Sequence, residues 1–288
     1  MQRFFCFYYV SLYNINPMWN GKYGFFDYKG NITGYNGQDY MSPIQYILTA
    51  IGVVGVIFLL FFLRNIKKEK SKRMLWIMGI VFTSLYIIKT SWESYWDIKI
   101  GGGFNIWILP FDTCSIFMPA LLVAGLSKKD SIYERVAAVF LATIGLAGGI
   151  ANFIFLRGLK YYPMFTFGAL YSFFWHLAMV FVALFIPVTK FHKFEWKDIL
   201  IAMIPMLLYS VFVIPFNYVK DLDFMLLNGA GGVPLIEGLA EKLINAHLRV
   251  FATLLMLLAY LAVSALFVSI YIGIPKLKNR IFTSKKSK

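Results

Sequence analysis

The sequence has little of what most soluble enzymes use for catalysis. Of its 288 residues, only two are cysteines and three are histidines. It contains no phosphate-binding loop, metal-ligand pattern or cofactor fingerprint, so we expect no metal ion and no other cofactor. Cys6 and Cys114 fall in different predicted elements, and we expect no disulfide between them. Any chemistry must therefore come from a small number of polar side chains.

Charge is also scarce. Only 15% of the residues are charged while 59% are hydrophobic, and the mean hydropathy is +0.67, a composition that excludes an ordinary soluble domain. Seven segments each offer the roughly 20 apolar residues that a helix needs to cross a bilayer, where backbone polar groups must pair within their own segment. The sequence therefore predicts an all-α, polytopic membrane protein with seven transmembrane helices, near residues 44–63, 74–90, 107–126, 135–156, 164–188, 199–218 and 247–273.

Acidic residues are half as numerous as basic ones, with 14 Asp and Glu against 28 Lys and Arg. Of the basic residues, 18 lie in four regions that fall on one side of a seven-span protein: 64–73, 127–135, 190–197 and 276–288. Because Lys and Arg mark the cytoplasmic side, we expect the N-terminus outside the cell membrane and the C-terminus in the cytoplasm. These clusters would contact anionic lipid of the inner leaflet. They are too short and too dispersed to indicate nucleic-acid binding.

The chain divides into three predicted regions. Residues 1–43 form an outer interfacial segment, residues 44–273 form the seven-helix domain, and residues 274–288 form a basic cytoplasmic tail. Within the domain, residues 219–246 are expected to form an outer loop with a short amphipathic helix. The small residues of Gly145–Gly149 ("GLAGG") should let a neighbouring helix approach closely.

Prolines interrupt two of the predicted spans. Pro110 and Pro119 lie in the third span, and Pro205 and Pro215 lie in the sixth. Proline removes a backbone donor and clashes with the preceding turn, so these helices should kink or open locally.

One apolar span contains a run of polar side chains, in "LPFDTCSIFM" (Leu109–Met118). Ionisable groups inside a membrane are costly and usually face the interior of the bundle. If the spans are continuous helices, Cys114 lies about 10 Å and His176 about 18 Å below the outer surface. Because the predicted ends of the spans can shift by a few residues, the two side chains could lie side by side. The candidate site residues of this outer half are Asp112, Cys114, Ser115, Asn152, His176, Tyr209 and Asn217.

A thiol and an imidazole suit acyl transfer. An imidazole can take the proton of a thiol and later return it to a leaving alkoxide. We therefore interpret Cys114 as a possible nucleophile and His176 as its base, with Asn152, Tyr209 or backbone amides near Pro110 as donors to an oxyanion.

Other interpretations stay open. A buried Cys or His is often purely structural. On a regular helix Asp112 points about 200° away from Cys114 and shares a face with Ser115 instead, so it could pair with Lys99 or Arg157. The polar residues could also form the site of a transporter or flippase for a small or lipid-like solute, or a hydrogen-bond network in a non-catalytic sensor or scaffold.

Four motifs resemble a known family. "LPFDTCSIFM" (Leu109–Met118), "FGALYSFFWHLAMV" (Phe167–Val180), "EWKDIL" (Glu195–Leu200) and "FNYVKDLDFMLL" (Phe216–Leu227) are similar, in order and spacing, to segments of the bacterial YwaF-type integral membrane proteins.

That family is distantly similar to eukaryotic multispan acyltransferases of ether phospholipids and to androgen-induced hydrolases of fatty-acid esters. The resemblance implies a Cys nucleophile and a His base on separate spans, here Cys114 and His176, and a membrane lipid as the substrate. The chain departs from the family signature at Asp112, where a His is usual, and at Asp223, where an Asn is usual.

Overall fold

The computed structural model describes residues 24–28, 43–101, 103–155, 162–229 and 236–284. In these residues the regular elements are helical: α1 (Pro43–Leu63), α2 (Lys68–Lys99), η2 (Ile106–Ile108), η3 (Thr113–Ile116), α3 (Phe117–Leu126), α4 (Ile132–Ala142), α5 (Ile144–Phe155), α7 (Phe167–Val188), α8 (Asp198–Ile201), α9 (Met203–Lys220), η4 (Phe224–Leu226), α10 (Glu237–Asn245) and α11 (Arg249–Ser284). The described segments include seven that are long and apolar enough to cross a membrane, and these confirm the predicted spans to within a few residues at most ends. The orientation of the termini stays a prediction.

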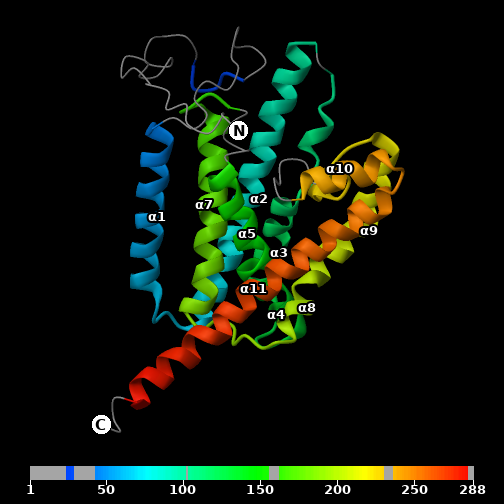
Figure 1. Cartoon of the computed structure of the whole chain (residues 1–288). Coiled ribbons are helices and arrows are strands. Elements are labelled where there is room, and N and C mark those ends of the chain that lie inside the picture. The colour runs from blue at the N-terminus through cyan, green and yellow to red at the C-terminus, as the bar shows by residue number, and fades with distance from the viewer. Residues whose placement is uncertain (1–23, 29–42, 102, 156–161, 230–235, 285–288) are drawn as a thin grey trace.

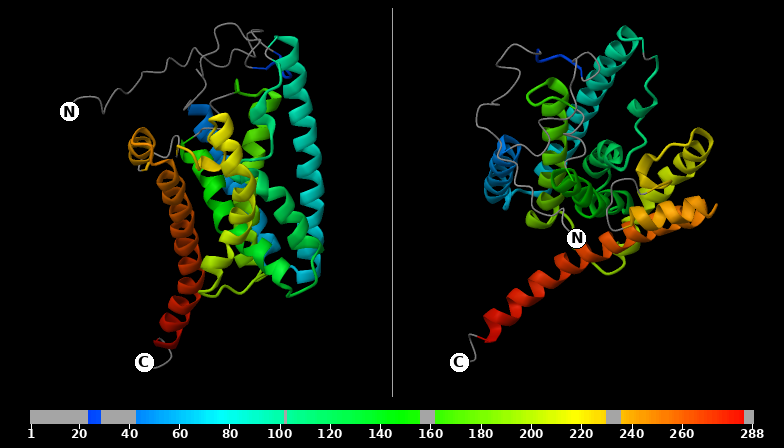
Figure 2. Two further views of the ribbon diagram at one scale, coloured as in Figure 1. Left: turned by 90° about the vertical axis from the view of Figure 1, so that its right-hand side faces the viewer. Right: turned by 45° about the horizontal axis from the view of Figure 1, so that its top comes forward.

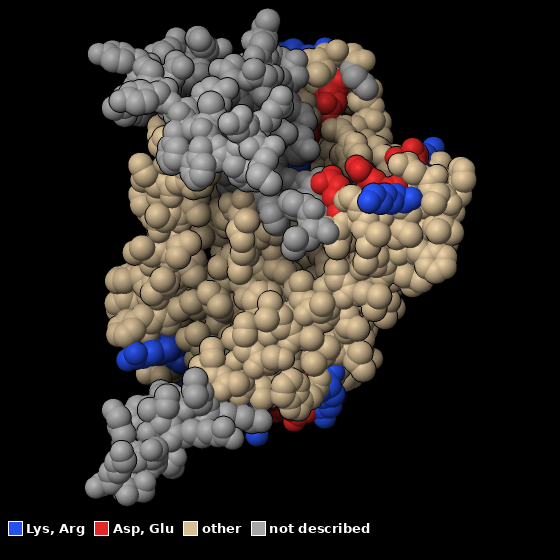
Figure 3. Space-filling view, in the orientation of Figure 1, with Lys and Arg blue, Asp and Glu red and all other residues tan. Residues whose placement is uncertain are grey.

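The spans form a bundle with α1 at its edge. α1 packs beside α7, and α11 crosses the bundle obliquely (Figure 1). α10 is the short helix expected in the loop between the last two spans, and it lies crosswise at the end of α11 (Figure 2). Charged side chains gather toward the two ends of the face drawn in Figure 3, with a broad uncharged band between them. This distribution fits a protein whose middle lies in hydrocarbon.

Two glycines set how closely the central helices approach. A Cβ on Gly125 of α3 would lie 2.5 Å from the backbone nitrogen of Trp76 on α2. A Cβ on Gly149 of α5 would lie 3.1 Å from the carbonyl oxygen of His176 on α7. The predicted role of Gly145–Gly149 is therefore confirmed, since only small residues permit such contacts between helix backbones.

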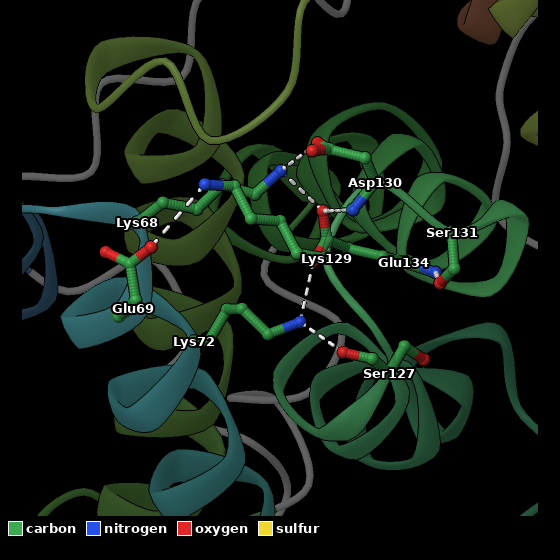
Figure 4. Close-up of polar contacts among 8 residues, drawn as sticks. All are labelled: Lys68, Glu69, Lys72, Ser127, Lys129, Asp130, Ser131 and Glu134. Atoms are coloured by element: carbon green, nitrogen blue, oxygen red, sulfur yellow. Dashed lines mark hydrogen bonds and ion pairs between the residues drawn. The ribbon is translucent and has the colours of Figure 1, made fainter.

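A cluster of ion pairs closes the end of the bundle where α2 begins, here called the basic end. Lys68 contacts both Asp130 (2.7 Å) and Glu134 (2.6 Å), and Lys72 contacts Glu134 (2.6 Å) and the carbonyl of Ser127, as Figure 4 shows. The nearly buried Glu134 lies in the first turn of α4. These contacts tie α2 to the connection between α3 and α4.

A second set of contacts at the basic end joins α4 to α8. Arg135 contacts Asp198 (2.7 Å) and Glu195 (2.9 Å), and His192 also contacts Asp198 (2.9 Å). Many of the acidic residues therefore pair with the basic clusters that the sequence marks as cytoplasmic.

The opposite end, here called the cavity end, holds the short described piece of the N-terminal segment. Phe167 donates its backbone N–H to the carbonyl of Phe25 (2.8 Å), and the indoles of Trp92 and Trp96 donate to the carbonyl of Phe26 (3.0 and 2.9 Å). This piece is thereby fixed to α2 and α7. The rest of the predicted interfacial segment, with Cys6, lies outside the described residues.

Several predicted boundaries need correction. α2 continues to Lys99, past the predicted end of the second span near residue 90, so Glu93 and Asp97 lie within the helix. α11 continues to Ser284, through most of the predicted basic tail. The third span is an α-helix only from Phe117 onward, and its broken first half forms part of the site described next.

Candidate functional site

The third span opens into irregular backbone between η2 and α3. Pro110 lacks an N–H, and the residue before a proline is held away from the helical region. Leu109 is accordingly extended (φ −66°, ψ 143°), and so is Asp112 (φ −78°, ψ 153°). The prediction that a proline opens this helix is confirmed for Pro110, whereas Pro119 lies within the first turn of α3. The assumption of a continuous helix through Cys114 is wrong. The depth of about 10 Å and the separation of about 200° assumed a regular helix and do not apply here.

The opened turn brings three of the predicted site residues together. Asp112 occupies the N-cap position of η3, and its carbonyl accepts the backbone N–H of Ser115 (2.9 Å). Cys114 is a free, half-buried thiol in this turn, and Ser115 is buried. We call Asp112–Ser115 the thiol turn.

Hydroxyl groups from other spans hydrogen-bond to this segment. Tyr86 of α2 donates to the carbonyl of Ile108 (2.6 Å). The Tyr260 hydroxyl of α11 lies 2.9 Å from the Thr113 hydroxyl and donates to the carbonyl of Met225 (3.0 Å). Irregular backbone at membrane depth is tolerated only where protein or a cavity satisfies its polar groups, and here both conditions hold.

A cavity of about 460 Å³ lies at the cavity end, next to the opened segment. We call it the polar cavity. Its walls come from the N-terminal piece, α2, the opened third span, the residues before α7 and the connection after α9, and they consist of Tyr28, Lys89, Glu93, Asn105, Trp107, Ile108, Asp112, Tyr162, Asp223 and Leu226. Three acidic residues and one basic residue face this space.

A shielded ion pair forms one wall of the polar cavity. The Lys89 ammonium lies 2.5 Å from Glu93, one turn further along α2, and the Tyr162 hydroxyl donates to the other oxygen of the same carboxylate. Burial, together with the negative charge of Glu93, raises the pKa of Tyr162 well above its usual value. Tyr162 therefore remains a protonated donor, and both oxygens of Glu93 are engaged.

A second buried carboxylate lies beside this wall. Asp97 is only 9% exposed, and its Oδ2 has no hydrogen-bond partner among the described residues. Burial, together with Glu93 and Asp97, raises the pKa of the nearby Tyr28. The cavity end therefore concentrates negative charge, with tyrosine hydroxyls as donors toward it.

His176 lies on α7 and is half-buried. Its Nδ1 is 2.7 Å from the carbonyl oxygen of Ser172. A carbonyl can only accept, so Nδ1 carries the proton and Nε2 of the neutral ring is an acceptor. The hydrogen bonds of the described residues do not join His176 to Cys114, and their catalytic pairing stays a prediction.

The remaining predicted site residues lie on other helices. Asn217 is fully buried and holds both backbone groups of Phe224, accepting its N–H (3.1 Å) and donating to its carbonyl (2.9 Å). Asn152 is buried in α5. Tyr209 lines a separate apolar groove. Among the proposed partners of Asp112, Lys99 lies 4.6 Å from the ring centre of Trp96, while Arg157 lies outside the described residues.

Residues that sequence reasoning left out of the site form much of the polar cavity. The sequence did carry a signal for one pair, because Lys89 and Glu93 are four residues apart and share a helix face. No sequence signal places Tyr28, Tyr162 and Asp223 around the same space, since each comes from a different connection.

The structure defines a polytopic helical membrane protein with seven candidate spans and a polar cavity beside a broken span. The described residues hold no group of three or more His, Cys, Asp or Glu side chains arranged for a metal ion.

The chain belongs to the TMEM164 family, a family of membrane proteins that it matches over residues 39–263. No curated protein and no solved structure matches it. The relationship to the YwaF-type proteins stays a prediction, as does the membrane in which the protein resides.

Proposed function

We propose that the protein transfers or hydrolyses an acyl group of a membrane lipid, with Cys114 as the nucleophile and His176 as the general base. The observation that carries the proposal is the position of Cys114. The break in the third span puts this thiol on an irregular turn whose first residue, Asp112, lines the polar cavity. A nucleophile at such a turn can reach an ester at the boundary between a polar cavity and hydrocarbon.

The proposed reaction has two steps. The Nε2 atom of His176 takes the thiol proton, and the Cys114 sulfur attacks the ester carbonyl carbon, so that a C–S bond forms as the ester C–O bond breaks. The imidazolium returns the proton to the departing alkoxide. The hydroxyl of a second lipid, or water, then attacks the thioester and regenerates the thiol.

The tautomer of His176 supports its proposed role. The carbonyl of Ser172 holds the proton on Nδ1, which leaves Nε2 as the basic atom. The mechanism requires Nε2 to reach the Cys114 sulfur directly or through one water. That requirement makes His176 the most informative residue to change.

The test is alkylation of the purified protein by a long-chain electrophile across pH, followed by peptide mass analysis. Cys6 is the internal comparison, and His176→Ala is the second arm. We expect fast labelling of Cys114 near neutral pH that slows in His176→Ala. Slow labelling that is the same in both proteins would overturn the proposal.

A second candidate function is transport of a small or lipid-like solute. The fourth span is interrupted at Thr143 (φ −112°, ψ −82°), as the third is near Pro110. Discontinuous helices together with a cavity lined by charged side chains are typical of transporters. Solute uptake into proteoliposomes that is lost in Asp112→Asn, with Cys114→Ala unaffected, would favour this function over acyl transfer.

A further inference from the structure

A groove on the membrane-facing side of the bundle lies beside the thiol turn. It has a volume of about 740 Å³ and runs between α3, α4 and α9. Its floor contains Ile116, Ala120 and Ala137, which are all buried, while Leu208 and Phe212 of α9 form an exposed wall. We call it the apolar groove. The groove is hollow over these residues because two of the three side chains are small alanines.

The apolar groove follows the direction of the spans. Its wall on α9 extends from Ile204 to Phe212, which is about 12 Å at 1.5 Å per residue. On the third span it extends from Phe111 to Val123, toward the basic end. A groove in this direction lies parallel to the acyl chains of the surrounding lipid.

The groove and the polar cavity meet on one segment of chain. Asp112 and Ile108 line the polar cavity, whereas Phe111 and Ile116 line the apolar groove. Cys114 lies between Asp112 and Ile116 in sequence and packs against the hydrophobic core. The thiol turn therefore separates a space lined by acidic, basic and polar side chains from one lined almost entirely by hydrocarbon.

We propose that the apolar groove binds one acyl chain of a membrane lipid, oriented with its carboxyl end at the thiol turn and its methyl end toward Val123. The proposal rests on the acyl chemistry above for its functional meaning, because the groove would then hold the chain whose ester Cys114 attacks. The apolar walls match a hydrocarbon chain. The meeting of the two spaces at one turn matches a molecule with a polar end and an apolar end.

The test is photocrosslinking of the full-length Cys114→Ala protein, in phosphatidylcholine vesicles that contain a trace of lipid carrying a diazirine on an oleoyl or a decanoyl chain. This background removes the proposed nucleophile, so labelling does not depend on turnover. We expect crosslinks on the peptides of α3 and α9 that contain Val123 and Leu208.

Two variants block the groove at different depths, and each has a defined expectation. Leu208→Trp should reduce labelling in the groove by about tenfold, the change that corresponds to about 1.4 kcal/mol. Val123→Trp, near the basic end, should reduce labelling by the oleoyl probe more than labelling by the decanoyl probe. The matched control is Val211→Trp, because Val211 is similarly exposed on α9 (67% against 63% for Leu208) and does not line the groove.

The outcomes distinguish binding of an acyl chain in the groove from the reactivity of Cys114. Groove labelling that Leu208→Trp removes and Val211→Trp preserves supports the proposal, even if Cys114 of the unmodified protein proves unreactive. Uniform labelling of all lipid-facing helices, or equal effects of the two Trp variants, overturns the proposal and leaves the reactivity of Cys114 untouched. The absence of any lipid adduct on the peptides that contain Val123 and Leu208 would also overturn it.

Discussion

The close packing of α3 on α2 yields a quantitative prediction, because α3 is the continuous helix that follows the thiol turn. A Cβ added at Gly125 would lie 2.5 Å from both the Cβ and the backbone nitrogen of Trp76, and 2.8 Å from the carbonyl oxygen of Lys72. Two of these atoms belong to the backbone of α2 and cannot rotate away. Gly125→Ala must therefore push the two helices apart.

The cost follows from what is known of overpacked cores, where one extra methyl group that forces backbone shifts costs about 1–3 kcal/mol. Replacing a helical glycine with alanine returns at most about 1 kcal/mol through helix propensity. Gly55→Ala on α1 is the control, because a Cβ there would have no neighbour within 4 Å and the variant keeps the propensity gain.

The assay is the free energy of unfolding of both variants and the unmodified protein, measured by titration with denaturing detergent. Gly55→Ala should be as stable as the unmodified protein or more stable, and Gly125→Ala should be about 1–3 kcal/mol less stable than Gly55→Ala, because both variants share the propensity gain. Because α3 directly follows the thiol turn, alkylation of Cys114 should also change in Gly125→Ala only. Equal stabilities of the two variants would refute the inferred helix contact.

Three further predictions concern polar contacts. Asn217→Leu leaves the buried backbone N–H of Phe224 without a partner, while the Phe224 carbonyl keeps the N–H of Leu227 (3.2 Å). The variant should therefore destabilise the protein by about 1–3 kcal/mol, measured by the same titration, and an unchanged stability would contradict the contact. Glu93→Gln leaves the Lys89 ammonium in the polar cavity without its counter-ion. Because removing one charge of a buried pair costs about 3–5 kcal/mol, the variant should have a lower thermal midpoint. A midpoint equal to that of the unmodified protein would argue against burial of this pair. The Lys68 ammonium holds the pKa of the exposed Asp130 carboxyl below its usual value. The contribution of this carboxylate to stability is therefore present above its unfolded-state pKa and lost as the pH falls through its folded-state pKa. The difference in thermal midpoint between the unmodified protein and Asp130→Asn should shrink on acidification, and a constant difference would contradict the pairing.

Much of the fold was predictable because hydrocarbon imposes simple rules. A span must be long, apolar and hydrogen-bonded within itself, so the composition alone predicts seven spans, and the structure has seven candidates. The helix boundaries were harder to predict. Hydropathy ends where charge begins, yet α2 continues past Lys89 and Glu93 because the two side chains pair with each other one turn apart.

The site was only partly predictable. Pro110 predicted a kinked or locally opened helix, and the structure contains an opened one. The walls of the polar cavity depend on which connections fold over it. Tyr28 and Tyr162 lie far apart in sequence and in different connections, so no periodicity could assign them to one space.

The broken third span explains why the site needs residues from several other helices. In an unbroken helix Asp112 and Cys114 would point about 200° apart, and the chain would offer no continuous wall between a polar and an apolar space. Opening that helix frees backbone carbonyls, and each one left unsatisfied in lipid would cost several kcal/mol. Tyr86 satisfies the carbonyl of Ile108, and Tyr260 bridges Thr113 to the connection after α9. The hydroxyls of α2 and α11 therefore stabilise the opened conformation. The thiol turn is for that reason a product of the assembled bundle, and substitutions at Tyr86 or Tyr260 would act on it without touching the thiol.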